Sequence, residues 1–155
     1  MLVYRIAKSE KRSKDISGVG AFNTGGRWNS PGTYMLYTSE NSSLAYLENL
    51  VHFDPVNIPP NLFIITIDLK ITDSLIYTFP DKLYPESWKV LDNLENKNLG
   101  DQLMFGQEYL AIKNRSAVNA YEYNYLLNPL FPGFRDVAKV VSVEKLNVDA
   151  RLIKS

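Results

Sequence analysis

The 155-residue sequence contains no cysteine and only one histidine, His52. Without cysteine, the chain has no thiol nucleophile, no disulfide and no thiolate metal ligand. A single histidine excludes multi-histidine metal sites and argues against a serine–histidine catalytic triad. We therefore expect no metal site, and any catalysis must depend on other side chains.

The chain also lacks an excess of charge and a long hydrophobic run. It carries 17 basic and 17 acidic residues, so its formal net charge is zero. A balanced charge argues against direct nucleic-acid binding through bulk electrostatics, although a local basic patch stays open. No run of about 18 apolar residues predicts a membrane span, and the N-terminus lacks the apolar core of a signal peptide. The sequence predicts one cytoplasmic domain, residues 1–155, that does not bind membranes.

Hydrophobic periodicity and turn residues predict a mixture of strands and helices. We expect strands at residues 2–7, 34–38, 62–69, 75–78, 109–113 and 139–146, and extended chain at 117–121. We expect helices at 42 to about 52, 85–96 and 99–105, with a polar connector at 8–15 and loops at 18–32 and 127–134. Asn41 or Ser39 is expected to cap the first helix. Strands and helices do not alternate regularly, so the predicted class is α+β, a compact mixed sheet with flanking helices.

The stretch from Gly18 to Glu48 concentrates the chemistry of the chain. A glycine-rich loop contains Arg27, a strand-like segment contains Tyr37, and a helix carries Glu48. An arginine can bind phosphate through two parallel hydrogen bonds, and a tyrosine ring can stack on a base. A carboxylate can stabilise positive charge on a ribose. The pattern predicts a site for an anionic ligand that contains a sugar.

Known phosphate-binding motifs do not explain the glycine-rich loop. The loop matches neither G-x-x-x-x-G-K-[ST] nor a G-x-G-x-x-G that joins a strand to a helix. Glycine-rich loops often only turn the chain, so Arg27 is open to two interpretations, a ligand contact or a surface residue.

Helical spacing places Glu48 beside Leu44 and Val51, on the apolar face of its helix. A carboxylate in that position costs free energy unless it is paired or hydrogen-bonded. One interpretation is a core salt bridge with Arg5 or Arg27. The other is a catalytic carboxylate at the floor of a pocket, and the residues alone leave both open.

Tyr37 and Ser116 have ordinary structural interpretations when each is taken alone. Tyr37 is one of 10 tyrosines, and most buried tyrosines simply pack in a core. Ser116 follows a predicted strand, where serines commonly cap turns, and no histidine is available to activate it as a nucleophile.

Motifs spread over nearly the whole chain carry a family resemblance. They are Tyr4-Arg5-Ile6, Gly18-x-Gly20-Ala21, Gly25-Gly26-Arg27-Trp28-Asn29-Ser30-Pro31-Gly32, Tyr37-Thr38-Ser39, Leu44-Ala45-Tyr46-Leu47-Glu48, Ser116-Ala117 and Glu122-Tyr123-Asn124-Tyr125-Leu126-Leu127-Asn128-Pro129. With them the chain resembles the RES domain, the toxin of bacterial Xre–RES toxin–antitoxin pairs. The family is named for an arginine, a glutamate and a serine, which correspond here to Arg27, Glu48 and Ser116. Two departures lie outside these residues: Phe131-Pro132 stands where His-Pro is common, and Arg115 where proline is frequent.

The resemblance implies a fold related to ADP-ribosyltransferases and an enzyme that cleaves the nicotinamide–ribose bond of NAD+. Relatives pass the ribosyl group to water or to inorganic phosphate, which would here be a co-substrate, and no tightly bound cofactor is implied. By the resemblance, the catalytic set is Arg27, Tyr37, Glu48 and Ser116, and the residues that bind NAD+ are Arg5, Arg27, Tyr37 and Asn124. A cognate Xre-type helix-turn-helix antitoxin would cover the active site and prevent growth arrest.

Two other functions share these residues. The first is an ADP-ribosyltransferase that modifies a macromolecule, and the second is a catalytically silent binding module. The complete arginine–tyrosine–glutamate–serine set argues against a silent module. Transferases often carry a second acidic residue shortly before the catalytic glutamate, and Tyr46 and Leu47 stand there. The absence of that acidic residue favours simple NAD+ consumption. The sequence leaves the oligomeric state open, including a homodimer within a larger toxin–antitoxin complex.

Overall fold

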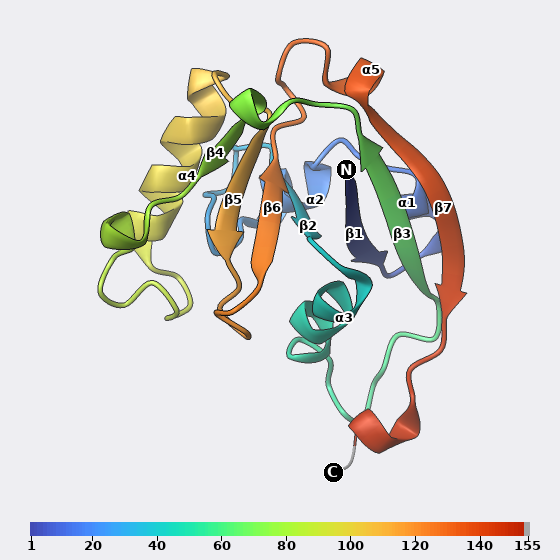
Figure 1. Cartoon of the computed structure of the whole chain (residues 1–155). Helices are drawn as coiled ribbons and strands as arrows, with labels where there is room; N and C mark the ends of the chain where they lie inside the picture. Colours follow the sequence, from blue (N-terminus) through green and yellow to red (C-terminus); the bar gives the residue numbers. More distant parts are fainter. Residues whose placement is uncertain (154–155) are drawn as a thin grey trace.

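A single seven-stranded mixed sheet organises the computed structural model, which describes residues 1–153 (Figure 1). The strands are β1 (Leu2–Ala7), β2 (Leu36–Ser39), β3 (Leu62–Leu69), β4 (Ile76–Thr78), β5 (Ala111–Arg115), β6 (Tyr123–Leu127) and β7 (Ala138–Leu146). Their order across the sheet is β4-β5-β6-β2-β1-β3-β7. Only β4 and β5 are parallel among these described neighbours, and the other pairs are antiparallel.

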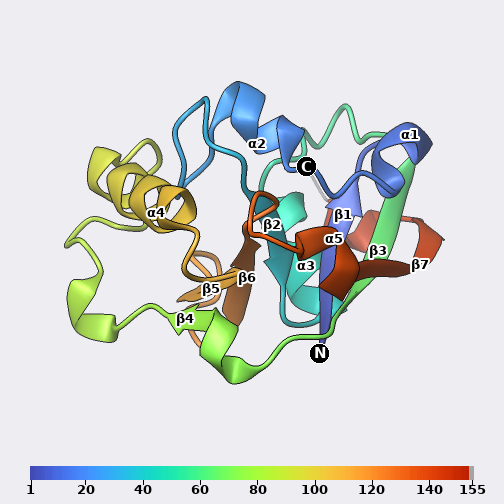
Figure 2. The same cartoon turned by 90° about the horizontal axis from the view of Figure 1, so that it is seen from above.

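Short helices flank the sheet. They are α1 (Glu10–Ser13), α2 (Val19–Thr24), α3 (Ser42–Leu50), α4 (Leu94–Gly106) and α5 (Phe134–Val137). In Figures 1 and 2, α4 lies at the β4–β5 end of the molecule, at the opposite end from β7. The predicted α+β class with a compact mixed sheet and flanking helices is confirmed. In the described residues, no helix has the length and hydropathy required to cross a membrane.

The main core follows β3, which pairs with β1 on one side and β7 on the other. Ile65, Ile67 and Leu69 are fully buried, in line with the strand predicted for residues 62–69. A second core surrounds Trp28 and Met104, and joins the glycine-rich loop to α4. Gly100 allows this approach, because a Cβ there would lie 1.7 Å from the carbonyl oxygen of Trp28.

The sheet opens between β1 and β2. In the described chain these two strands are in register at one position, Tyr4 opposite Ser39, whereas β1 and β3 pair along six positions from Leu2 to Ala7. The helix α3 packs against both β1 and β2. Asn41 caps α3, since its side chain accepts a hydrogen bond from the Leu44 backbone N–H, so one of the two expected caps is confirmed.

Two predicted segments differ from the structure because tertiary contacts decide their conformation. Residues 18–32 contain the helix α2, although five glycines predict a loop. The helix predicted at 85–96 is wrong over residues 85–93, where turns precede α4, whereas the helix predicted at 99–105 lies within α4 and is confirmed. Arg27 and Asn96 bind the carbonyl of Trp88, which a helix would use internally, and Asp92 has a positive φ of 59°. Asn93 then caps α4.

Strand β6 is the one strand of the described sheet that the sequence pattern missed. Its five residues lie between β2 and β5. The extended chain predicted for residues 117–121 is a turn. The hydroxyl of Ser116 accepts hydrogen bonds from the backbone N–H groups of Val118 and Asn119, and these bonds hold that turn.

Candidate active site

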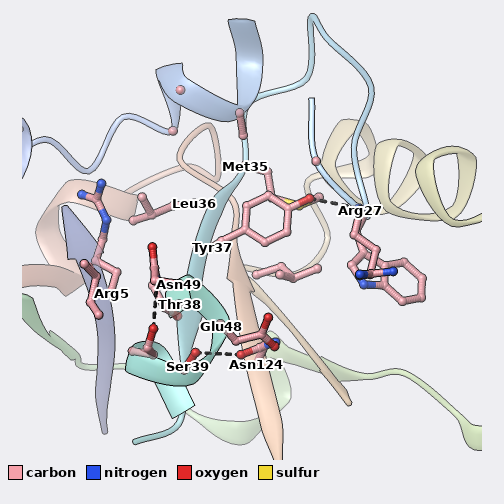
Figure 3. Close-up of a pocket in the computed structure, with 18 of the residues that line it drawn as sticks. Arg5, Arg27, Met35, Leu36, Tyr37, Thr38, Ser39, Glu48, Asn49 and Asn124 are labelled. Carbon is pink, nitrogen blue, oxygen red and sulfur yellow. Dashed lines mark hydrogen bonds between the residues drawn. The ribbon is translucent and has the colours of Figure 1, made fainter. Parts of the chain in front are cut away.

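A cavity of about 670 Å³ lies where β1 and β2 separate. Its lining comes from both strands, from α2 and the glycine-rich loop, from α3, and from the adjoining strands β5 and β6. Figure 3 shows α2 on one side of the cavity and α3 on the other, with the sheet behind them. The volume is within the range of small-molecule pockets, roughly 300–1,000 Å³.

The glycine-rich loop is fixed by the two residues that follow Arg27. Trp28 is buried and packs against the rings of Phe79, Tyr84 and Trp88. Asn29 is fully buried, and its Nδ2 donates to the carbonyls of Ala21, Ser30 and Thr33. Both side chains restrain the loop, so Arg27 is presented from a fixed backbone.

Tyr37 on β2 contributes an aromatic ring to the cavity wall (Figure 3). Its hydroxyl donates to Asn29 Oδ1 at 2.8 Å and accepts from the Trp28 N–H at 3.0 Å. Burial raises the pKa of Tyr37 above its ordinary value, so the hydroxyl stays protonated at neutral pH. Gly26 is required beside this ring, because a Cβ there would lie 2.6 Å from the tyrosine oxygen.

Arg27 is half-buried and lines the cavity. Its Nη1 donates to the carbonyls of Trp88, Lys89 and Val90, at 3.3, 2.6 and 3.4 Å. Within residues 1–153, no carboxylate pairs with Arg27, and its Nη2 and Nε make no hydrogen bond. The positive charge and two donor nitrogens therefore remain for a ligand.

Arg5 on β1 lies across the cavity from Arg27, on the other side of Tyr37 (Figure 3). Its Nη1 donates to the backbone carbonyls of Asp15 and Arg12, at 2.5 and 3.5 Å. Burial lowers the pKa of Arg5 from its ordinary value, with the Asp15 carboxylate acting in the opposite direction. An arginine remains charged in either case. The cavity thus has two guanidinium groups that form no salt bridge within residues 1–153, although the Asp15 carboxylate interacts with Arg5 over a longer distance.

Glu48 on α3 also faces the cavity. Its Oε1 accepts two hydrogen bonds of 2.6 Å, one from Ser116 Oγ and one from Asn124 Nδ2. Its Oε2 has no hydrogen-bond partner within residues 1–153, and it is not a buried unsatisfied atom. The carboxylate is therefore held on one oxygen and accessible on the other.

The core salt bridge considered for Glu48 is wrong, because no cationic side chain in the described range pairs with it. The expected apolar face is also only partly correct. Leu44 is buried, but Val51 is 56% exposed. Two neutral hydrogen-bond donors, rather than an arginine, stabilise the carboxylate.

Ser116 and Asn124 have different relations to the cavity. Ser116 is fully buried and is not part of the lining, so its geometry fits a residue that positions Glu48. Asn124 lines the cavity, but both ends of its amide are engaged, since Oδ1 accepts from Ser39 Oγ at 2.7 Å (Figure 3).

The sheet register reveals polar residues that the sequence did not single out. Ser39, Asn124 and Asn114 occupy successive paired positions on β2, β6 and β5. Paired positions in an antiparallel sheet put side chains on the same face, so these three form a polar row beside Glu48. A correct placement of β6 would have been needed to find this row from the sequence.

Together these groups can bind and polarise one ligand. Two cations lie on either side of an aromatic ring, and an accessible carboxylate lies on the adjacent helix. Among residues 1–153, no three His, Cys, Asp or Glu side chains gather to hold a metal ion. In an α+β protein, this arrangement of groups can bind an anionic ligand and stabilise positive charge on it.

The chain belongs to the RES domain family, whose model matches residues 2–149. "Toxin Res" of Photorhabdus laumondii is 28% identical over 156 aligned positions, which cover 100% of this chain and 99% of the relative. The "Prs ADP-ribosylating toxin" of a Sphingobium strain is 30% identical, with coverages of 97% and 96%.

The fold is also similar to a solved structure. A chain in the crystal structure of the M. tuberculosis MbcT–MbcA toxin–antitoxin complex matches with a TM-score of 0.69. The match covers 94% of this chain and 84% of the other chain, at 17% sequence identity. At that identity the likeness concerns the fold.

Proposed function

We propose that this protein is the toxin of a toxin–antitoxin pair and that it destroys NAD+ by cleaving the nicotinamide–ribose bond. The observation that carries this proposal is the Glu48 carboxylate, held through Oε1 and accessible through Oε2, in a cavity with two arginines that form no salt bridge within residues 1–153. The RES family membership and the toxin names of the relatives support it.

Binding would use the two arginines and the ring. NAD+ carries a diphosphate, and a guanidinium can bind phosphate through two parallel hydrogen bonds. The unused Nη2 and Nε of Arg27 form such a fork, and Arg5 supplies a second cation from the opposite wall. Tyr37 offers a ring held rigid by its hydroxyl, against which an aromatic part of the substrate can pack.

In the chemical step, the ribose C1′–N bond breaks and its electron pair goes to the pyridinium nitrogen. Nicotinamide then leaves as a neutral molecule, so no general acid is required. Positive charge develops on the ribose ring as an oxocarbenium ion. Glu48 Oε2 would stabilise that charge, and the hydrogen bonds from Ser116 and Asn124 would keep the carboxylate in place.

The acceptor completes the reaction. Water would give ADP-ribose and one proton, whereas inorganic phosphate would give the phosphorylated sugar. NAD+ is a substrate in both cases, so the proposal requires no tightly bound cofactor. We place the activity in the cytoplasm, where the proposed substrate occurs.

We further propose an Xre-type helix-turn-helix antitoxin that covers the cavity. A similar fold occurs in the M. tuberculosis MbcT–MbcA toxin–antitoxin complex, which supports an antitoxin partner for this chain. Covering the opening between β1 and β2 would exclude NAD+ without any change in the toxin.

The purified chain should be incubated with NAD+, with and without phosphate, and the products identified by mass spectrometry. Release of nicotinamide in equal amount to NAD+ lost is the expected result. The second product, ADP-ribose or its phosphorylated form, identifies the acceptor. No nicotinamide release from a folded preparation would contradict the proposal.

A macromolecular ADP-ribosyltransferase is the second candidate, because a relative at 30% identity is named an ADP-ribosylating toxin. Residues of the same cavity would then catalyse transfer of the ADP-ribosyl group to a protein. Labelled NAD+ added to a cell extract separates the two activities, since only the transferase leaves label bound to macromolecules.

A further inference from the structure

Among the polar side chains of the cavity that the proposed chemistry does not use, Asn114 differs by being deeply buried without a hydrogen bond in the described chain. Asn114 on β5 is 1% exposed and lines the cavity. Its Oδ1 is buried without a hydrogen-bond partner, and no partner of its Nδ2 occurs among residues 1–153. An unpaired buried carbonyl oxygen is unfavourable, and native proteins rarely keep one without a reason.

The position of Asn114 suggests what satisfies it. Asn114 pairs with Asn124 across β5 and β6, and Asn124 donates to Glu48 Oε1 at 2.6 Å. The amide of Asn124 is engaged at both ends, by Glu48 and by Ser39, whereas its neighbour Asn114 is engaged at neither. The other buried amide with an unpaired oxygen, Asn96, is not part of the cavity wall and donates to the Trp88 carbonyl.

We propose that the Asn114 amide recognises the carboxamide of the nicotinamide leaving group, an inference that rests on the proposed NAD+ cleavage. A carboxamide offers one acceptor and two donors, which complement the acceptor and donors of an asparagine amide. The nicotinamide ring is attached to the ribose carbon that Glu48 faces, so a group one strand beyond Asn124 is near it. Leu126 lies two residues along β6 from Asn124, on the same face, and provides apolar surface beside the ring.

This contact would make Asn114 a specificity residue. A leaving group whose amide nitrogen is replaced by a methyl group keeps the carbonyl but loses both donors. With the amide turned so that its oxygen faces the cavity, the Asn114 oxygen would then remain unpaired in the complex, which penalises that analogue relative to NAD+. Binding of NAD+ would remove the cost that the unpaired oxygen has in the free protein.

The test compares kcat/KM for NAD+ with kcat/KM for its 3-acetylpyridine analogue, in the wild type and in Asn114→Leu. Leucine has the same branched arrangement of four side-chain heavy atoms as asparagine and has no polar atom. The variant should lose on the order of tenfold in kcat/KM for NAD+, the size of one neutral hydrogen bond, and much less for the analogue. An equal loss for both substrates, or no loss for either, would overturn the assignment.

A second measurement needs no variant. Free nicotinamide should inhibit the wild type competitively with NAD+, and 3-acetylpyridine should inhibit it roughly tenfold less. Equal inhibition by the two compounds would also overturn the proposal. Wild-type protein that releases no nicotinamide would remove both this inference and the proposed function, whereas cleavage with an unchanged substrate ratio removes only the role of Asn114.

Discussion

At the scale of single residues, the two hydrogen bonds to Glu48 both fix its carboxylate and leave one of its oxygens free for a ligand. Ser116 and Asn124 both donate to Oε1, which leaves Oε2 for the ligand. A carboxylate paired with an arginine would have less negative charge to offer a developing cation. The two neutral donors hold Glu48 in place without neutralising it.

We expect Glu48→Gln to keep NAD+ binding and to lose on the order of 100-fold or more in turnover, because the charge opposite the ribose is removed. The glutamine oxygen can still accept from Ser116 and Asn124, so the fold should be retained. Melting temperature and turnover should be measured on the same preparation. Glu122→Gln is a matched control, since Glu122 is also half-buried and accepts from an asparagine, Asn41, outside the cavity.

A less stable but fully active Glu48→Gln protein would assign a structural role to Glu48. Loss of activity in the Glu122→Gln control would show that removing any acid from this region disturbs the enzyme.

Substitutions of Arg27 test its proposed contact with the diphosphate of NAD+. Arg27→Ala should lower kcat/KM for NAD+ roughly 10- to 100-fold, the worth of a charge-assisted bidentate contact. Arg27→Lys should recover little of it, because an ammonium group cannot form the planar fork. Arg135→Lys, at an exposed position outside the cavity, should be unaffected. Full activity of Arg27→Lys at limiting NAD+ would contradict the phosphate contact.

At the scale of elements, local pattern predicted some segments well and failed where distant contacts dominate. The strands at residues 2–7 and 62–69 and the helix starting at Ser42 follow their own periodicity, and all three are confirmed. Turns replace the helix expected at 85–96 because Arg27, about 60 positions earlier, binds its carbonyls. No sequence window contains that information.

Some residues of the candidate site were likewise predictable from the sequence, and others were not. Family motifs pointed to Arg27, Tyr37 and Glu48, which the structure brings to one cavity. Asn114 has no local signal, because its importance follows from its pairing with Asn124 across two strands. Its missing hydrogen-bond partner is visible only after folding.

The contact between α4 and the glycine-rich loop gives an element-scale prediction. Gly100→Ala should destabilise the protein by about 1–3 kcal/mol, because the added Cβ would overlap the Trp28 carbonyl and force α4 away. Gly106→Ala is the matched control on the same helix, since a Cβ there meets nothing within 4 Å. Urea denaturation of both variants provides the test, and equal stability of the two would contradict the close approach.

At the scale of the whole molecule, the open junction between β1 and β2 links the fold to the proposed activity. The order β4-β5-β6-β2-β1-β3-β7 brings two groups of strands together at a single described pair, Tyr4 and Ser39. The cavity occupies this junction, with Arg5 from one group and Tyr37 from the other. Closing the junction with a longer β1–β2 ladder would remove the site, so the topology itself creates the space for a ligand.

The central claim is that this site consumes NAD+, and the cellular NAD+ content tests it most directly. NAD+ should be measured over time after induction of the wild type without antitoxin, beside Glu48→Gln induced to the same protein level. We expect NAD+ to fall before growth stops in the wild-type culture, and both NAD+ and growth to persist with the variant. Growth arrest at an unchanged NAD+ content would contradict the account.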